Sequence, residues 1–165
     1  GLLSVWNKDL FSFRYSFTGD GYLGVCVEWK DSLLYIVNVY SSCNLSGKRK
    51  LWSDLLDFKK NNAPGEWCIG GDFNSVTKVG ERRGCHAVGG QTERVEFTLF
   101  IDAMEVVDIP MMGKKFTWSN SDGSAMSRLD RFLLSDGFIE KGSITNQWVG
   151  NRDISDHCPI WLGCS

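Results

Sequence analysis

The chain has 165 residues, of which 42% are hydrophobic and 23% charged, and its formal net charge is −2. This composition is typical of one globular domain and excludes a disordered chain, while the lack of an apolar run of about 20 residues excludes a membrane span. The slight negative charge does not favour a dedicated nucleic-acid-binding module, but it permits an enzyme that gathers carboxylates around a cation.

The first forty residues are expected to form strands. Residues 2–6 are apolar, residues 9–18 alternate around aromatic side chains, and residues 23–29 and 33–40 form a hairpin across a short polar turn. The last of these segments is apolar almost throughout, which is typical of a central strand that is buried on both faces.

A helix is expected over residues 47–60, with Ser46 as its N-cap. Lysines occupy its last turn, where they favour the negative end of the helix dipole. Its apolar stripe consists of Leu51, Trp52, Leu55 and Leu56. Because a strand at residues 67–72 follows the helix, the segment predicts a helical crossover between two parallel strands.

The next segment, residues 75–90, is polar and punctuated by glycine, and we expect a surface loop suited to binding. A second helix is expected over residues 92–104, with one apolar face formed by Val95, Leu99, Phe100 and Ala103. Further strands are expected at residues 115–118, 128–134, 144–149 and 158–162. The pattern predicts one mixed α/β domain that covers residues 1–165.

The six cysteines show neither a Cys-x-x-Cys motif nor the spacing of a zinc site. Cys26 and Cys68 lie in apolar strand segments, where a buried thiol is expected to be inert. We therefore expect a reducing, intracellular compartment. The two histidines are too few for a histidine-rich metal site.

The strand that ends at Asp72 leads into a polar tip. Asp72 and Asn74 are two residues apart, and side chains at that spacing in a strand point the same way. Gly70 and Gly71 before them allow a sharp turn or a close approach of the backbone. Asp72 and Asn74 are equally suited to shaping a turn, because their side chains bond to nearby backbone groups.

Three other segments also place polar side chains at the end of an apolar strand. Together with the tip, they contribute Tyr40, Asp72, Asn74, Asp130, Asp156 and His157. Loops at one rim of an α/β sheet converge, and such a set would hold a phosphate together with Mg²⁺ or Mn²⁺. Plainer interpretations exist as well: a surface ion pair for Asp130, a half-buried histidine for His157 and a strand aromatic for Tyr40.

Three motifs follow one another along the chain: Gly-Asp-Phe-Asn at residues 71–74, Ser-Arg-Leu-Asp-Arg-Phe-Leu at 127–133 and Ser-Asp-His-Cys-Pro-Ile at 155–160. In this order they resemble the endonuclease/exonuclease/phosphatase family, which includes the DNase I-like enzymes and the abasic-site endonucleases. Glu-Arg-Arg-Gly at 81–84 and Lys-Phe-Thr-Trp-Ser-Asn at 115–120 are similar to the endonuclease domains of plant non-LTR (LINE-type) retrotransposons. The resemblance implies a DNase I-like four-layer α/β sandwich, in which two packed mixed sheets are flanked by helices.

The resemblance also implies roles in the cleavage of a phosphodiester. Asp72 would orient or deprotonate the attacking water, and Asn74 would hold that water or the phosphate. Tyr40 would donate a hydrogen bond to the phosphate. His157, paired with Asp130, would polarise a non-bridging oxygen as charge develops on it.

Further roles concern the metal and the substrate. Asp156 and Asp72 would bind Mg²⁺ or Mn²⁺. Trp118, Arg82 and Arg83 are candidates for stacking on the bases of DNA or neutralising its phosphates. Packing and loop charge explain these three residues equally well.

The family begins with a strand that ends in asparagine and a second strand that ends in a metal-binding glutamate. Asn7 and Glu28 lie in a different context, one in a loop and one on a later hairpin. We therefore expect a chain that lacks the first strands of the domain together with that glutamate.

The motifs predict a metal-dependent DNA endonuclease domain of retrotransposon origin. We expect it to act on DNA in the nucleus, to be monomeric and not to associate with a membrane. A first alternative is a phosphoesterase of the same fold that acts on lipid or inositol phosphates. A second is a catalytically inactive remnant, which the missing glutamate favours.

Overall fold

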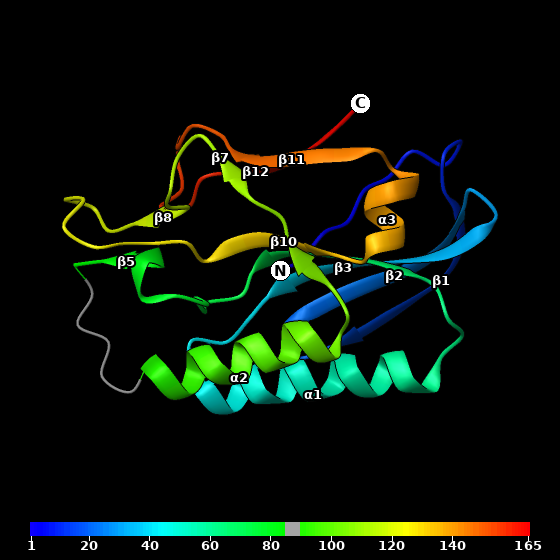
Figure 1. Ribbon diagram of the computed structural model, residues 1–165, viewed down its shortest axis with the longest axis horizontal. Helices are drawn as coiled ribbons and strands as arrows, with labels where there is room; N and C mark the ends of the chain where they lie inside the picture. Colours follow the sequence, from blue (N-terminus) through cyan, green and yellow to red (C-terminus); the bar gives the residue numbers. More distant parts are fainter. Residues whose placement is uncertain (85–89) are drawn as a thin grey trace.

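The computed structural model describes residues 1–84 and 90–165, which form one large sheet, two small sheets and three α-helices. The large sheet has the strand order β1-β2-β3-β4-β10-β6 (Figure 1). Its strands are β1 (Ser12–Gly19), β2 (Tyr22–Trp29), β3 (Ser32–Tyr40), β4 (Glu66–Asp72), β6 (Val107–Asp108) and β10 (Asp130–Leu134). None of the described helices is long and apolar enough to span a membrane.

The N-terminal part of the large sheet is an antiparallel meander of β1, β2 and β3. Lys30 and Asp31 make the turn between β2 and β3, with φ values of 47° and 62°. Two such residues twist the turn in the same sense as the strands, and the expected hairpin is confirmed. The expected strand at residues 2–6 is wrong: the segment has no regular structure, and Leu3 and Val5 are 80% and 84% exposed. An apolar run forms a strand only where a neighbour offers a matching register.

Helix α1 (Leu45–Asn61) connects β3 to β4 and makes these two strands a parallel pair, which confirms the predicted crossover. Its N-cap is Asn44 and not Ser46. The carboxamide oxygen of Asn44 accepts hydrogen bonds from the Gly47 N–H (2.8 Å) and from the Ser46 hydroxyl (2.9 Å), so the helix begins earlier than expected. Three residues of the expected stripe are buried, namely Leu51, Trp52 and Leu55.

Of the apolar face expected for helix α2 (Gly90–Ala103), Phe100 is buried, but the other buried residues differ from those that the sequence predicts. Val95 and Leu99 are 52% and 59% exposed. The buried residues are Phe97, Phe100 and Ile101. Phe97 stacks on Trp52 of α1 with ring centroids 5.6 Å apart. Aromatic rings bury more apolar area than Val or Leu, and their pairing decides how the helix is rotated.

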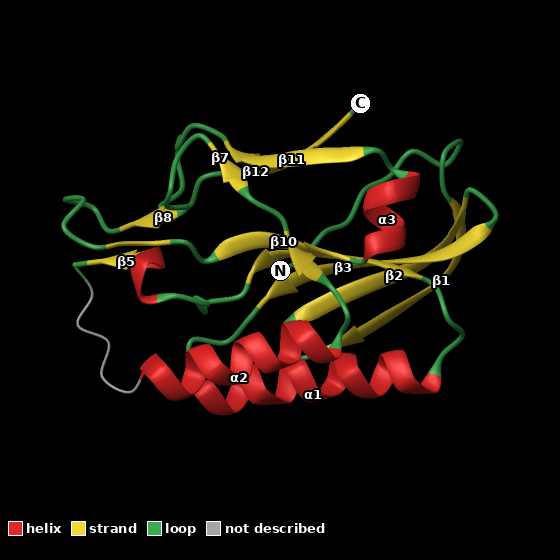
Figure 2. Ribbon diagram, viewed as in Figure 1, coloured by secondary structure: helices red, strands yellow, loops and turns green. Residues whose placement is uncertain are grey.

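The elements are arranged in layers, as Figure 2 shows. Helices α1 and α2 cover one face of the large sheet, and a smaller sheet with the order β12-β11-β7 lies on the opposite side together with helix α3. These elements are β7 (Met111–Met112), α3 (Asp136–Lys141), β11 (Ile144–Val149) and β12 (Ile160–Cys164). Packed sheets flanked by helices confirm the expected α/β sandwich class.

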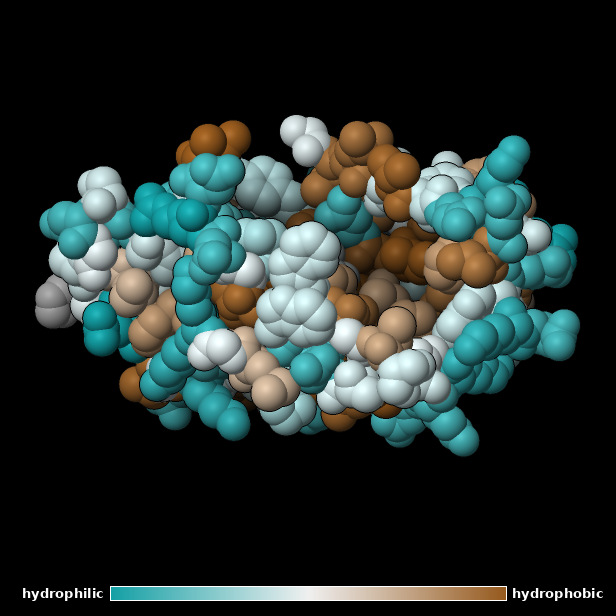
Figure 3. Space-filling model, turned by 90° about the horizontal axis from the view of Figure 1, so that it is seen from above, coloured by the Kyte–Doolittle hydropathy of each residue, from teal (hydrophilic) through white to brown (hydrophobic). Residues whose placement is uncertain are grey.

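The core beside the small sheet is less closed than the core beneath α1 and α2. Figure 3 shows the molecule from above, where hydrophobic side chains surround a hollow. Cys68 belongs to this second core, and burial raises the pKa of its thiol to about 12, as expected for an inert cysteine. Partly buried residues around this core include Ile109, Phe132, Ile144 and Leu162.

The expected surface loop at residues 75–90 contains regular structure. A 3₁₀ turn, η1 (Val79–Glu81), leads into a third sheet with the order β5-β9-β8, and Glu81 is buried. The prediction is therefore wrong for residues 79–83, whereas residues 75–78 have no regular structure, as expected, and residues 85–89 lie outside the described residues. The strands of the third sheet are β5 (Arg82–Arg83), β8 (Trp118–Ser119) and β9 (Met126–Ser127).

Two expected strands near the C-terminus are displaced. The strand expected at residues 115–118 is reduced to β8, and the strand expected at 158–162 begins later, as β12. In both places the backbone bonds to another segment: the Thr117 N–H donates to the Ser127 carbonyl of β9 (3.0 Å), and the Cys158 N–H donates to the Thr117 carbonyl (2.7 Å).

A buried ionic cluster lies against the end of β10. Arg131 has no exposed surface, and its guanidinium contacts Glu81 (3.0 Å) and Asp108 (2.8 Å). Arg128 contacts the same two carboxylates, at 3.2 Å and 2.7 Å. The arginines on either side of Asp130 thus have other partners, and the surface ion pair considered for Asp130 is not formed.

We predict that Glu81→Ala lowers the free energy of unfolding by about 3–5 kcal/mol, because it removes one carboxylate from a fully buried guanidinium. Glu96→Ala is the matched control: Glu96 pairs with the exposed Arg49, and its loss should cost less than about 1 kcal/mol. Urea denaturation at pH 7 measures both values. Equal losses for the two variants would contradict the prediction.

Candidate active site

Three polar residues form one row across the large sheet. Asp72 ends β4, and its register partners are Tyr40 at the end of β3 and Asp130 at the start of β10. Register partners in a sheet are close neighbours, so three distant parts of the sequence meet here. The predicted convergence of strand ends is found for these residues.

Two glycines shape the strand that carries Asp72. Gly71 has a φ of 135°, and a side chain there would overlap the Val39 carbonyl of β3. Gly70 faces the ring of Phe132 on β10, which occupies the space of a Cβ atom. The close approach predicted for this glycine pair therefore occurs on both sides of β4.

Asn74 reaches the site through a turn and not through strand alternation. Its φ is 48°, and its N–H donates to the Asp72 carboxylate over 2.8 Å. Its side-chain amide donates to the Ser41 carbonyl over 2.7 Å. The expectation that strand geometry aligns Asp72 with Asn74 is wrong, because the strand ends at Asp72 and an Asx turn follows.

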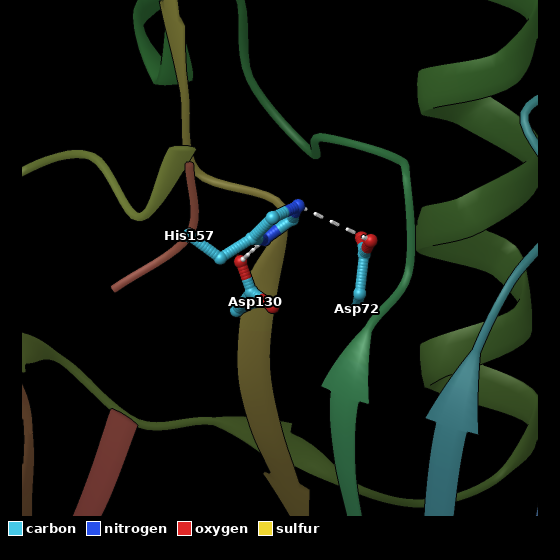
Figure 4. A group of neighbouring side chains, drawn as sticks. All are labelled: Asp72, Asp130 and His157. Atoms are coloured by element: carbon cyan, nitrogen blue, oxygen red, sulfur yellow. Dashed lines mark hydrogen bonds and ion pairs between the residues drawn. The ribbon is translucent and has the colours of Figure 1, made fainter. Parts of the chain in front are cut away.

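His157 lies between the two aspartates (Figure 4). Its Nδ1 is 2.7 Å from the Asp130 Oδ2, and its Nε2 is 3.7 Å from the Asp72 Oδ2. Asp130 and Asp72 are both buried at 9% and 8% exposure. The three side chains form a chain of acid, imidazole and acid, although they come from separate segments.

Thr117 supports this cluster, and the sequence analysis did not single it out. Its hydroxyl accepts hydrogen bonds from the N–H groups of Leu129 and Asp130, both at 3.0 Å. Its carbonyl accepts from the Cys158 N–H. A fully buried threonine thus joins the Asp130 strand to the His157 loop. Thr117 lies within the motif at residues 115–120, which was the only feature of the sequence that could have indicated its role.

Asp156 and Trp118 bind each other beside the cluster. The indole Nε1 of Trp118 donates to the Asp156 carboxylate over 2.9 Å, and this hydrogen bond holds the pKa of Asp156 below its ordinary value. Trp118 also forms a backbone bridge with His157. Asp156 therefore lies in the loop that carries His157, and Trp118 of β8 binds that loop.

The other expected site residues lie at the surface around the cluster or are only half-buried. Tyr40 is 62% exposed at the end of its strand. Arg82 is half-buried in β5, whereas Arg83 is exposed and its guanidinium lies 5.9 Å from the centre of the Phe116 ring. Glu28 ion-pairs with Arg14 and lies in β2 opposite Leu33, so it is far along the sheet from Tyr40.

The pKa values of two members of the cluster, Asp72 and His157, are raised above their ordinary values. Burial, followed by the nearby charge of Asp130, raises the pKa of Asp72 to about 6. The hydrogen bond that the His157 Nδ1–H donates to the Asp130 carboxylate raises the pKa of His157. At neutral pH the arrangement offers a carboxylate of increased basicity next to an imidazole that can donate from Nε2.

The same residues are suited to a divalent cation. Asp72, Asp130 and His157 each offer a ligand atom, and these atoms lie within 4.8 Å of one another. Carboxylate oxygens are the ligands that Mg²⁺ and Mn²⁺ prefer, and a cation would relieve the repulsion between two buried carboxylates. Among the described residues this cluster does not include Asp156, and the expected role of Asp156 beside Asp72 as a metal ligand stays a prediction.

Fold and site together define an α/β protein that gathers two aspartates and a histidine at its strand ends. Residues 2–157 match the Endonuclease/Exonuclease/phosphatase family, and the chain belongs to this family. The comparison with curated proteins gives no match.

Solved structures of low sequence identity share the fold. The endonuclease domain of TRAS1, a telomere-specific non-LTR retrotransposon, has a TM-score of 0.74 and 14% identity, over 97% of this chain and 71% of that domain. Beta toxin from Staphylococcus aureus has a TM-score of 0.62 and 18% identity, over 88% of this chain and 57% of the toxin. A mutant of that toxin with bound magnesium ions gives a TM-score of 0.62 and 17% identity, over 88% of this chain and 58% of the mutant. The chain thus spans little more than half the length of the toxin.

We predict that Asp72→Asn stabilises the protein at pH 8 by about 2 kcal/mol. A pKa of about 6 in the folded state exceeds the value of about 3.9 in an unfolded chain, so the ionisation of Asp72 lowers the stability progressively as the pH rises from about 4 to 6, and the loss stays constant above pH 6. The gain should vanish below pH 4, where Asp72 is protonated in both states. Denaturation of both proteins in metal-free buffer from pH 3.5 to pH 8 measures the difference. A variant that is destabilised at pH 8 would show that Asp72 stabilises the fold.

Proposed function

We propose that the chain is a metal-dependent phosphodiesterase domain that nicks DNA by in-line attack of water on a phosphodiester. The observation that carries the proposal is the Asp130–His157–Asp72 cluster, with its distances of 2.7 Å and 3.7 Å. Hydrolysis of a phosphodiester needs a base that activates the water and a hydrogen-bond donor that stabilises the negative charge developing on oxygen. This cluster contains both groups.

His157 is arranged to act as the donor. Asp130 binds Nδ1, which fixes the orientation of the ring and favours its charged form. Nε2 points toward Asp72, yet the distance of 3.7 Å exceeds that of a hydrogen bond. The Nε2 proton is therefore left for a non-bridging oxygen of the substrate.

Asp72 is arranged to act on the water. Its raised pKa of about 6 leaves it ionised at neutral pH but more basic than an ordinary aspartate. Asn74 holds one of its oxygens in place through a backbone hydrogen bond. Tyr40, its register partner on β3, is exposed and would donate a hydrogen bond from its hydroxyl to a bound phosphate.

Mg²⁺ or Mn²⁺ would be held by the carboxylates of Asp72 and Asp130 and would supply a Lewis acid that offsets the charge developing on the phosphoryl group. Asp156 would join them through the carboxylate oxygen that does not accept the Trp118 indole N–H. The beta toxin chain is longer than these 165 residues, which supports a further proposal: the metal-binding glutamate of the family is supplied by residues outside this sequence.

The order of the motifs and the structural similarity to the TRAS1 domain support DNA as the substrate and a LINE-type retrotransposon of plants as the origin. Such a domain would act in the nucleus. Arg83, exposed beside the half-buried Phe116, would contact the DNA backbone, and Arg82 and Trp118 would line the same side of the site.

The proposal predicts nicking of supercoiled plasmid DNA that requires Mg²⁺ or Mn²⁺. His157→Ala and Asp72→Asn should each lower kcat by about 10²–10⁴-fold, because each removes a group that acts in the transition state. Gel analysis of nicked circles over time measures the rates. Glu96→Gln, on the outer surface of α2, is the control and should nick at the wild-type rate.

Several results would contradict this assignment. Nicking that is unchanged in both variants would refute the proposed mechanism. Release of phosphate from phosphoinositides, without nicking, would identify the phosphoesterase alternative. Salt-dependent DNA binding without any cleavage would identify the inactive remnant.

The proposed additional carboxylate gives a separate prediction. A protein that extends upstream of Gly1 in the natural gene should nick DNA at least about 10²-fold faster than residues 1–165, since a missing metal ligand has effects of this size. Isothermal titration with Mn²⁺ should show tighter binding to the longer protein. Equal rates and equal affinities would show that the 165 residues contain the complete site.

A further inference from the structure

A buried lysine lies behind the proposed active site. Lys48, in the first turns of α1, is only 3% exposed. Its ammonium group donates to the Asn74 carbonyl over 2.5 Å and to the Glu93 carboxylate over 2.8 Å. A buried ammonium is retained only where its partners compensate for lost hydration, so both contacts have a strict geometry.

The two contacts connect three separate elements. Glu93 lies in the first turn of α2, Lys48 lies in α1, and Asn74 lies in the turn that follows β4. The chain leaves the large sheet at Asn74 and returns to the helical layer at α2. Lys48 therefore links α1 to both ends of the segment that connects β4 to α2.

A second ion pair between the same helices shows what is special about Lys48. Arg49 binds Glu96 through two hydrogen bonds of 2.8 Å and 2.7 Å, and its side chain is 53% exposed. That pair already links α1 to α2 at the surface. The contact of Lys48 with the Asn74 carbonyl is not needed to hold the two helices together. It instead links α1 to the turn beside Asp72.

The Asn74 turn needs such support. A residue with a φ of 48° is less stable than one in an ordinary conformation, unless nearby contacts hold it. In this conformation the Asn74 N–H reaches the Asp72 carboxylate, and the side-chain amide reaches the Ser41 carbonyl. The carbonyl of Asn74 is the remaining polar group of its backbone, and Lys48 binds it.

We propose that Lys48, paired with Glu93, is a positioning residue that holds the Asp72 carboxylate in its reactive orientation through the Asn74 turn. The ammonium group of Lys48 binds the Asn74 carbonyl and so restrains the backbone of Asn74. The N–H of that residue in turn binds the Asp72 carboxylate. The kinetic consequence of this inference rests on the proposed function, whereas the structural consequence does not.

The structural test is hydrogen exchange at the Asn74 amide, measured by NMR on the 165-residue chain. Lys48→Met should increase the exchange rate of this amide by about 10-fold or more, because the turn opens more often. Arg49→Met, which removes the exposed pair between the same helices, should leave the rate unchanged. Where Lys48→Met does not fold, Lys48→Gln keeps a donor and most of the volume and should change the exchange in the same direction.

The kinetic test uses nicking of plasmid DNA. Lys48→Met should lower kcat by roughly 10- to 100-fold, because a displacement of about 1 Å in a reacting group has effects of this size. KM should change by less than about 3-fold, since Lys48 does not face the substrate. Asn74→Gly provides a background in which a positive φ needs no support. There, the loss of Lys48 should reduce kcat several-fold less than in the wild-type chain.

The outcomes separate the two proposals. A wild-type chain that does not cleave DNA, but shows faster Asn74 exchange in Lys48→Met than in Arg49→Met, would contradict the proposed function and support the role of Lys48. Equal Asn74 exchange in Lys48→Met and wild type would overturn the inference. Effects of Lys48→Met and Asn74→Gly on kcat that simply multiply would overturn it as well.

Discussion

Two carboxylates lie side by side with little access to water at the ends of β4 and β10. Asp72 and Asp130 are register partners, both are at most 9% exposed, and burial makes the ionisation of Asp72 less favourable. His157 compensates for one of them through its Nδ1. Such a pair opposes folding at neutral pH, and it persists only because the surrounding structure holds it.

The support for this pair comes from polar groups that are themselves buried. Thr117 fixes the start of β10 and the loop of His157, while Lys48 binds the turn behind Asp72. Beneath β10, Arg131 is enclosed by the carboxylates of Glu81 and Asp108. Thr117 and Lys48 are satisfied by partners from distant segments, whereas the Nε of Arg131 has no hydrogen-bond partner among the described residues. Long-range hydrogen bonds therefore preorganise the site together with the local turn at Asn74.

Features that depend on neighbouring residues could be predicted from the sequence. The β2–β3 hairpin, the helical crossover to β4 and the glycine pair before Asp72 follow from turn residues, apolar spacing and missing side chains. Predictions failed where two local solutions have nearly equal energy. Asn44 and Ser46 are both good N-caps, and α2 has two possible apolar faces. Packing against Trp52 selects one of these faces.

The sequence by itself determined the family motifs, the chemistry of Asp72, Asp130 and His157, and the approximate places of the main strands. The tertiary structure alone decided which of these groups touch. His157 is 27 positions from Asp130, and Lys48 is 26 positions from Asn74. Contacts at such separations are set by strand register and by helix rotation, which depend on the whole core. For this reason the sequence indicated a phosphodiesterase site, while the lysine behind it became evident only in the folded chain.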